Sequence, residues 1–352
     1  MELLKKFAFA DLPIGQIHLG QRRKEGNRLM EFGNRTIAAR NGTKTGRRRK
    51  RGGIGAKEQL QLMLIMLPPL ILIFIFSYIP LYGVLIAFQD FVPGNPILSF
   101  DGSTQWVGLK HFTDFITSRT FTRLFRNTLV LSGLNLVFGF TAPIIFSLIL
   151  NEVKISSYKK LVQTASYLPY FISTVIAAGM VLSFIDTNGL INRIREIFGL
   201  PSKAFSMDPN YFPAIYTITN VWKTFGWDSI LYMSAMSSID MNLYEAAKLD
   251  GANRVQQMWN ITLPSIKPTI MLLLIFAIGS VLSTNTDLVL LLYNPAVYET
   301  ADVMATYVYR DSLLGGRFSF GTAVGLFTSV LNFTLVFIAN FISRKVADYS
   351  LW

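Results

Sequence analysis

The run from Trp222 to Asp228 places two charged side chains between aromatic ones in an otherwise apolar stretch. The charged residues are Lys223 and Asp228, and the aromatic ones are Trp222 and Trp227. A charge in an apolar span is costly unless it faces water or a partner, so these residues are functional candidates. They could form a polar and aromatic wall of a sugar path, with Trp faces stacking on pyranose rings. They could equally form an interfacial belt, with Lys223 reaching toward the headgroups.

The spacing of the two charges limits what they can do together. Lys223 and Asp228 lie five residues apart, which is about 140° around a helix. They would therefore not pair on one face of a straight helix, although Gly226 between them could relax that. Asn135 and Asn220, with Asn285, could line the same path or bond across helices.

The chain offers little for catalysis. It has no cysteine, and its two histidines, His18 and His111, lie far apart, which argues against thiolate chemistry and a metal site. Gly52–Glu58 has glycines and a lysine at the wrong spacing for a phosphate-binding loop, so any ATP must be bound by another subunit. We expect no catalytic residue, no metal and no cofactor in this chain.

The elements that hold these residues are membrane spans. Only 15% of the 352 residues are charged, against about 25% in soluble proteins. Six apolar runs are long enough to cross a hydrocarbon core of about 30 Å. They lie near 60–88, 127–150, 161–186, 211–238, 264–284 and 321–343. Prolines interrupt several of them, which helix bundles tolerate.

Basic residues near the span ends predict the orientation. The cluster GRRRKRGG at Gly46–Gly53 precedes the first span, which indicates a cytoplasmic N-terminus. Six crossings then put 151–160, 239–263 and the C-terminal Arg344-Lys345 in the cytoplasm. The loops 89–126, 187–210 and 285–320 fall outside. We expect a multi-pass protein of a bacterial cytoplasmic membrane with both termini inside.

Most of the net charge of +12 belongs to the N-terminal tail. Residues 1–59 carry a net charge of +10 and the remainder +2, so the basic pI is no argument for nucleic acid. The segment 1–56 has a disordered composition and precedes a membrane domain at 57–352. Its cluster Arg47–Arg51 could bind anionic lipid or serve as a solvated topology signal.

Outside the spans, WVGLKHFTDF (Trp106–Phe115) carries apolar residues at helical spacing. This predicts a short helix with one apolar face, which either lies in the outer interface or packs on the bundle.

A polar interruption, Glu245–Pro264, separates two spans. Asp240 is a plausible N-cap, and Asp250-Gly251 predicts a turn between two short helices. Gly251 would permit a backbone conformation that a Cβ would obstruct. Pro264 would open the next span, where its missing N–H costs nothing.

This segment resembles the cytoplasmic coupling loop of ABC importer permeases, whose seven fixed positions it matches without insertion. They are Glu245, Ala246, Ala247, Gly251, Ile261, Leu263 and Pro264, within a loop that spans 241–263. The resemblance implies that a partner ATPase contacts this segment and tilts the bundle through the fifth span.

The whole body resembles sugar permeases of binding-protein-dependent ABC importers, in the polysaccharide or lipoprotein-type branch. Leu67–Phe91, Trp222–Asp240 and Arg317–Trp352 carry this resemblance together with WVGLKHF. It implies an all-α membrane protein with six transmembrane helices, a MetI-like ABC type I importer permease fold and cytoplasmic coupling helices. Asp228 departs from the pattern, where a neutral residue such as Asn is expected, and this leaves the substrate open.

The resemblance also implies partners for an importer of oligosaccharide or polysaccharide fragments. They are a second homologous permease, two ATPase subunits that bind ATP and Mg, an extracellular solute-binding protein and membrane lipid. Two alternatives remain open on sequence alone. One is a stand-alone secondary transporter that uses Lys223 and Asp228 as a charge relay. The other is a membrane scaffold whose basic tail binds lipid or nucleic acid.

Overall fold

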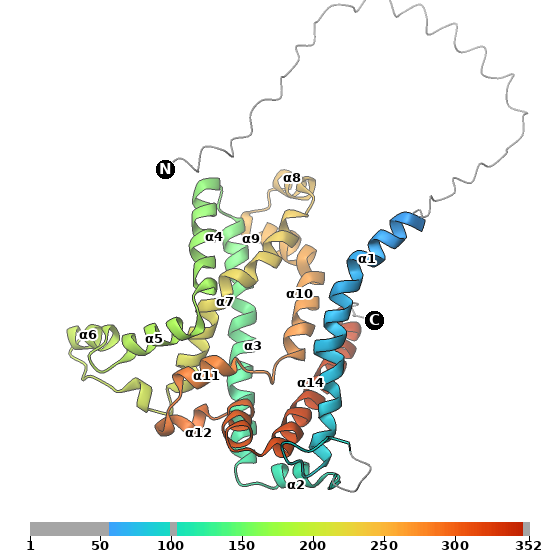
Figure 1. Cartoon of the computed structure of the whole chain (residues 1–352). Helices are drawn as coiled ribbons and strands as arrows, with labels where there is room; N and C mark the ends of the chain where they lie inside the picture. Colours follow the sequence, from blue (N-terminus) through green and yellow to red (C-terminus); the bar gives the residue numbers. More distant parts are fainter. Residues whose placement is uncertain (1–55, 99–103, 348–352) are drawn as a thin grey trace, which may run out of the picture. The chain divides into compact units, whose positions relative to one another are not determined.

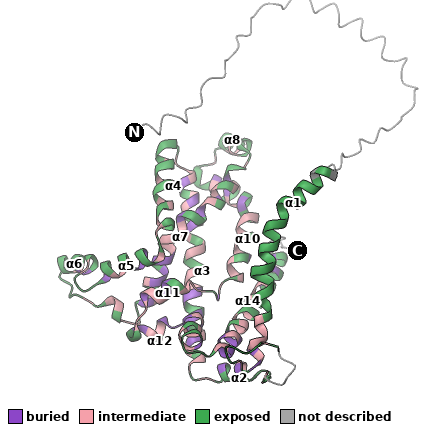
Figure 2. Cartoon of the chain, viewed as in Figure 1, coloured by how far each residue is buried: buried purple, intermediate pink, exposed green. Residues whose placement is uncertain are grey.

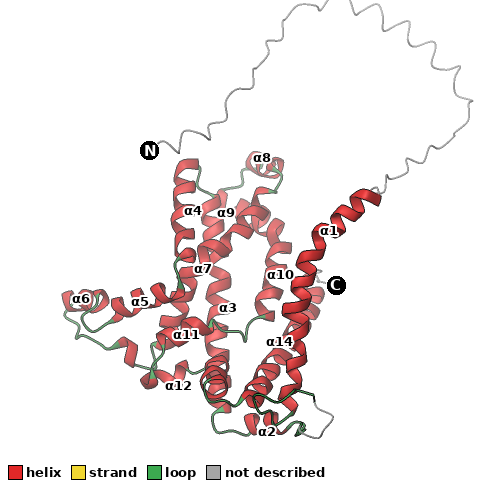
Figure 3. Ribbon diagram, viewed as in Figure 1, coloured by secondary structure: helices red, strands yellow, loops and turns green. Residues whose placement is uncertain are grey.

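The computed structural model of the protein describes residues 56–98 and 104–347 (Figures 1 and 3). The chain divides into two compact units, Met1–Ile71 and Leu72–Trp352. The predicted tail, 1–56, lies outside the described residues apart from Ala56. Its basic cluster Arg47–Arg51 therefore stays a prediction.

The described residues fold into helices, which confirms the predicted all-α class. They form no strand, and their only β pairing is an isolated antiparallel bridge between Gln89 and Trp106. The α-helices are α1 (Ala56–Ile73), α2 (Lys110–Ile116), α3 (Phe121–Asn151), α4 (Ser156–Phe171), α5 (Thr174–Ile185), α6 (Leu190–Ile197), α7 (Phe212–Ser237), α8 (Met241–Leu249), α9 (Arg254–Gln257), α10 (Leu263–Gly279), α11 (Thr286–Leu292), α12 (Tyr298–Ala301), α13 (Met304–Tyr307) and α14 (Phe318–Ala347). The π and 3₁₀ segments are η1 (Phe74–Tyr78), η2 (Ile79–Phe88), η3 (Phe205–Met207), η4 (Met258–Thr262), η5 (Pro295–Val297) and η6 (Val308–Leu313).

The long helices of the second unit pack side by side as a bundle. Helix α3 packs along α7, α10 packs along α14, and α4 contacts α7 on the other side (Figure 1). Proline lies in the first turn of both α7 and α10, at Pro213 and Pro264. At Pro213 the fixed φ favours the helix, and the N–H that proline lacks would have no partner there. At Pro264, by contrast, the helical segment η4 leads directly into α10, so the helix runs on through this proline from Arg254.

Five helical stretches of the described chain are long and apolar enough to cross a membrane. They are Gln59–Phe88, Phe121–Asn151, Thr174–Ile197, Arg254–Gly279 and Phe318–Lys345. Four of them coincide with predicted spans. The predicted span 211–238 forms α7, which is not among the five. Five candidate spans are therefore established, and α7 has the length but not the apolar composition of a sixth.

The predicted span 161–186, in which Pro169 is an expected interruption, is divided between two helices. Helix α4 ends at Phe171, and α5 starts at Thr174 in a different direction (Figure 1). Pro169 lies in the last turn of α4, and Ile172 adopts an extended backbone with φ −72° and ψ 132°. Ser173 then caps α5 by accepting a hydrogen bond from the N–H of Ile176. A proline followed by a strong N-cap favours a new helix over continuation.

Many large apolar residues of the bundle are exposed, and Figure 2 shows in green that exposed positions are common along the long helices. On α14, Phe333 and Phe341 are 64% and 65% exposed. Exposure of so many apolar side chains is unfavourable in water and marks contact with lipid or with another subunit. The buried core is correspondingly small and lies where helices meet, as at Tyr232 and Ile266 between α7 and α10.

The predicted short helix near Trp106–Phe115 forms α2 and packs on the bundle. Phe115 is 1% exposed and contacts the rings of Phe121, Phe320 and Phe327 edge-on. Of the two alternatives for this segment, the helix packed on the bundle is therefore correct at Phe115, near the C-terminal end of α2, whereas Trp106 and Leu109 are exposed.

An ion cluster fixes the segment between α12 and α14. Asp302 is fully buried, and its carboxylate accepts two hydrogen bonds from the guanidinium of Arg310, at 3.1 Å and 2.8 Å. Arg123 on α3 reaches the same carboxylate at 3.4 Å, and Thr306 donates to it at 3.0 Å. The hydrogen bond to Asp302 raises the pKa of Arg310 above its usual value, so the guanidinium stays charged. The cluster ties residues 302–310 to α3.

Candidate functional site

Helix α7 holds five of the six predicted pathway residues, and it directs Lys223 and Asp228 to different faces. Lys223 donates a hydrogen bond to Thr174 Oγ1 of α5 at 3.1 Å. Asp228 lines a cavity against α3 and α10, and no ion pair joins it to Lys223 in the described chain. The two charges therefore point to different neighbours, as their spacing of five residues predicts. Trp222 is half-buried between these faces.

The aromatic face of α7 belongs to the junction of α4 and α5. The ring of Trp227 stacks on Tyr170, with centroids 4.6 Å apart and planes 5° from parallel. Phe171 meets the same indole edge-on at 5.6 Å. Trp227 thus supports the break between α4 and α5 and contributes nothing to the cavity that Asp228 lines.

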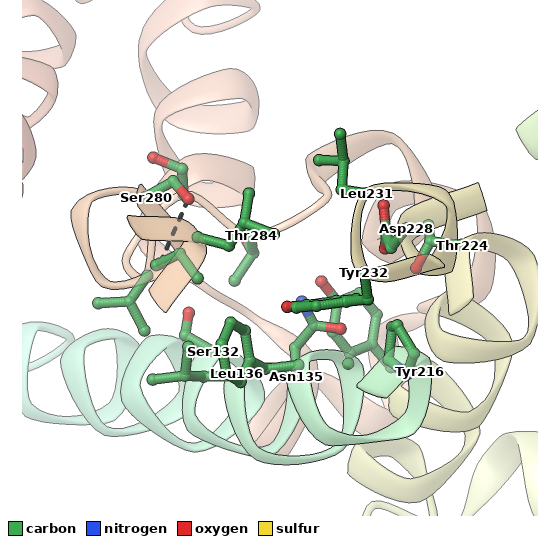
Figure 4. A pocket seen from close by; sticks show the side chains of 17 residues that line it. Ser132, Asn135, Leu136, Tyr216, Thr224, Asp228, Leu231, Tyr232, Ser280 and Thr284 are labelled. Carbon is green, nitrogen blue, oxygen red and sulfur yellow. Dashed lines mark hydrogen bonds between the residues drawn. The ribbon is translucent and has the colours of Figure 1, made fainter. Parts of the chain in front are cut away.

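The cavity lies between three walls and has a volume of about 300 Å³ (Figure 4). Residues of α3, of α7, and of α10 with the turn after it contribute to these walls. They are Ser132, Asn135, Leu136, Gly139, Phe140 and Pro143 from α3, Tyr216, Thr224, Asp228, Leu231 and Tyr232 from α7, and Leu273, Ala277, Ser280, Val281, Ser283 and Thr284 from the third wall. Only Asn135 and Asp228 of this set were predicted pathway residues.

The lining of the cavity mixes hydroxyl groups with aromatic rings. Asp228, Thr224 and Tyr232 lie together on the α7 wall, opposite Ser132 and Thr284 (Figure 4). The buried hydroxyl oxygens of Ser132 and Thr284 have no hydrogen-bond partner among the described residues. Leaving such a group unpaired costs about 1–3 kcal/mol, and because both oxygens are covered they do not face the cavity. The exposed polar residues of the lining are Asp228, Ser280 and Ser283.

A row of three asparagines braces one side of the cavity. Asn220 donates to Asn135 Oδ1 at 2.7 Å, and Asn285 donates to Asn220 Oδ1 at 3.1 Å. The backbone N–H of Asn285 in turn donates to the hydroxyl of Tyr216 at 3.0 Å. The row joins α3, α7 and the start of α11. The sequence predicted that these asparagines line a path or form hydrogen bonds between helices. All three form hydrogen bonds between helices, and Asn135 also lines the cavity.

The coupling segment, residues 241–263, forms two short helices joined by a turn. Asp240 caps α8 by accepting from the N–H of Asn242 at 2.9 Å, as predicted. Asn253 and Gln256 form a capping box at the start of α9. The chain continues through η4 into α10, so the segment is one helical path into that helix.

Gly251 makes the turn possible through its backbone conformation. Its φ is +79°, in the left-handed region that glycine adopts readily. A Cβ at this position would meet no heavy atom within 4 Å. The requirement for glycine therefore comes from the backbone, and the space around it is open.

The seven motif residues differ in exposure. Glu245, Ala246 and Pro264 are exposed, whereas Ala247, Ile261 and Leu263 are half-buried. Leu249 at the end of α8 is 90% exposed, the highest value among the large apolar residues described. It was not among the predicted site residues. The sequence signal that could have marked Leu249 is that it is an apolar residue immediately before the polar turn at Asp250-Gly251.

Arg254 connects the coupling segment to the end of α3. Its guanidinium donates to the backbone oxygen of Glu152 at 3.2 Å and lies 3.7 Å from the Glu152 carboxylate. Glu152 is the C-cap of α3, where backbone oxygens lack partners within the helix and cations are favoured. The coupling segment is thus attached covalently to α10 and by hydrogen bonding to α3. Both helices wall the cavity.

Residues 144–348 match a known sequence family, described as the binding-protein-dependent transport system inner membrane component. This range contains the coupling segment and most of the cavity walls.

Two relatives from Bacillus subtilis (strain 168) align with most of the chain. One is the polygalacturonan/rhamnogalacturonan transport system permease protein YteP, which is 43% identical over 87% of this chain and 94% of its own. The other is protein LplB, which is 41% identical over 84% of this chain and 92% of its own.

A crystal structure of a bacterial ABC transporter involved in the import of the acidic polysaccharide alginate has the same fold. Its matching chain is 42% identical, with a TM-score of 0.75 over 83% of this chain and 97% of that one. A second structure shows the bacterial alginate ABC transporter in complex with alginate pentasaccharide-bound periplasmic protein. There the matching chain is 40% identical, with a TM-score of 0.76 over 84% of this chain and 98% of that one.

Proposed function

The chain belongs to the family of binding-protein-dependent transport system inner membrane components, and on that premise we propose that it is one half of the membrane pathway of an ATP-driven importer. Its cargo is an oligosaccharide or polysaccharide fragment delivered by an extracellular solute-binding protein. The observation that carries the proposal is the similarity, over more than four fifths of the chain, to permeases of polysaccharide transporters.

The partners follow from the same proposal. A second homologous permease completes the pathway, and two ATPase subunits bind the ATP and Mg. The chain itself supplies mechanical coupling through Glu245–Pro264 and needs no catalytic residue. The short helices α8 and α9, together with the exposed Leu249, offer a surface that an ATPase subunit can bind.

We further propose six crossings, with α7 as the sixth and both termini in the cytoplasm. Helices α8 and α9 lie at the same end of the bundle as the connection from α3 to α4 (Figure 1). This arrangement supports the orientation in which 151–160 and 239–263 share the cytoplasmic side. Helix α7 carries Lys223 and Asp228, which accounts for its lower hydropathy.

Purification in mild detergent tests the proposal. The tagged chain should co-purify with a second permease and an ATPase. The complex in liposomes, with its binding protein, should take up labelled oligosaccharide only when ATP is present on the ATPase side. Uptake driven by an ion gradient in liposomes that hold this chain alone would contradict it and favour a secondary transporter. The separate directions of Lys223 and Asp228 give no support to a charge relay between them.

A further inference from the structure

We infer that the cavity between α3, α7 and α10 accepts an uncharged part of a saccharide and that Asp228 disfavours sugars that carry carboxylates. This inference rests on the proposed function and names its substrate class. It goes beyond the printed names of the relatives, two of which concern polygalacturonan and alginate.

The charge of the walls is the first argument. Asp228 is a lining residue, and none of the described residues of this chain that line the cavity is a lysine, arginine or histidine. Lys223, the basic residue nearest to Asp228 in sequence, donates a hydrogen bond to Thr174 on the opposite face of α7. A sugar carboxylate in this space would meet a like charge, and this chain places no cation beside it. Like-charge contacts are among the strongest devices for rejecting a wrong ligand.

The hydrogen-bonding capacity of the walls is the second argument. Ser280 and Ser283 line the cavity and are exposed, so their hydroxyls can reach a ligand. Asn135 and Thr224 add half-buried polar side chains from α3 and α7. Hydroxyls both donate and accept, whereas an ionised carboxylate such as Asp228 only accepts. Sugar hydroxyls satisfy both kinds of partner, because each can donate to Asp228 and accept from Ser280 or Ser283.

The shape and apolar surface agree with a ring-sized ligand. A volume of about 300 Å³ is at the small end of ligand pockets, which run from about 300 to 1,000 Å³. Phe140, which is half-buried, and Leu231, which is exposed, contribute apolar surface to the walls, whereas Tyr216 and Tyr232 are buried behind it. The C–H faces of a neutral sugar can pack on the Phe140 ring while its hydroxyls reach the polar groups.

A matched pair of probes tests the inference on the purified complex of both permeases and the ATPases, with the binding protein omitted. The probes are labelled pentagalacturonate and its fully methyl-esterified form, which differ in charge but share their backbone. Equilibrium dialysis should show the ester binding about tenfold tighter or more. Asp228→Asn should reduce that preference, and Asp287→Asn, an exposed acid outside the cavity lining, should leave it unchanged.

Equal or tighter binding of the acid would overturn the inference, as would a preference that Asp228→Asn does not alter. Binding of neither probe would also overturn it, because the cavity would then not be a saccharide site. The proposed function is tested separately, by ATP-dependent uptake of neutral and acidic pentasaccharides into liposomes with the binding protein present. Import of the acidic ones alone would refute the inference and leave the importer proposal standing. Uptake of none would refute the importer proposal.

Discussion

Asn220 of α7 donates a hydrogen bond from its side-chain amide to Asn135 Oδ1 of α3 over 2.7 Å. The two residues are 85 positions apart in sequence, and the same Asn220 accepts from Asn285. A buried amide that both donates and accepts fixes the register of three helices at once. In this protein it braces the wall of the cavity that Asp228 and Tyr216 line.

Replacing Asn220 with leucine should lower the stability of the bundle. The change leaves Asn135 Oδ1 and the Asn285 amide without their partner, which in membrane helices costs about 1–2 kcal/mol. The unfolding midpoint of the detergent-purified protein should fall. The exposed Asn242→Ala serves as a matched control with no expected shift. An unchanged midpoint for Asn220→Leu would show that the row of asparagines does not brace the helices.

Gly226 should not tolerate alanine. A Cβ there would overlap the backbone carbonyl of Ser166 on α4, which cannot move away without shifting that helix. Overpacking of this kind costs about 1–3 kcal/mol, so Gly226→Ala should destabilise the contact between α4 and α7. Gly133→Ala on α3 is the control, because a Cβ there meets nothing within 4 Å. Equal melting behaviour of the two variants would contradict the close approach of α4 to α7.

Among the acidic residues, Asp302 should be the one whose replacement lowers the free energy of unfolding most. It is fully buried between Arg310 and Arg123, and removing it leaves two guanidinium groups without their shared partner. Both guanidinium groups keep part of their hydration, at 40% and 33% exposed, and a hydrogen bond to a charged group contributes about 1.5–3 kcal/mol, so Asp302→Asn should unfold at a lower denaturant concentration. Asp311→Asn removes the partner of Arg317 at a more exposed pair and should cost about 1 kcal/mol or less. If Asp302→Asn and Asp311→Asn lower the free energy of unfolding by similar amounts, the buried cluster has no special role in stability.

Gly251 offers a test of coupling that depends on backbone conformation alone. Gly251→Val should be strained by about 1–2 kcal/mol at φ +79°, and we expect transport to fail while the protein still inserts in the membrane. Gly251→Asn should retain more transport, because asparagine tolerates the left-handed region and no atom lies near the new Cβ. Both variants are assayed for uptake and for ATP hydrolysis. Normal coupled transport by the valine variant would show that the segment is not the coupling element.

Arg254 should affect coupling more than stability. Its pair with Glu152 is exposed, and such pairs contribute about 0.2–1 kcal/mol. Arg254→Ala removes the hydrogen bond to the end of α3, so we expect more ATP to be hydrolysed for each saccharide imported. Arg254→Lys, which keeps the charge, should lie in between. Lys160→Ala, at an exposed position on α4, is the control. If Arg254→Ala leaves the amount of ATP hydrolysed per imported saccharide unchanged, α10 alone transmits the motion.

Much of the fold could be predicted because the apolar runs are long and their ends are marked locally. The N-cap at Asp240, the turn at Gly251 and the start of α10 near Pro264 all depend on neighbouring residues, and each is present in the structure. Pro169 marked an interruption in the run 161–186, but the sequence did not show that two helices of different direction would form. The apolar composition continues across Ile172, and only the extended backbone there separates α4 from α5.

The sequence by itself determined the helical class, the polar coupling segment with its caps, and the absence of a phosphate-binding loop, because these depend on residue type and short spacing. Only the tertiary structure decided which side chains share a site. It turned Trp227 toward Tyr170 and Asp228 toward the cavity, although the two are neighbours in sequence. It also brought Ser132 and Thr284, which no motif marked, to two walls of one cavity. The physical reason is that helix packing selects which face of α7 meets which neighbour, and that choice depends on contacts made across the whole length of the chain.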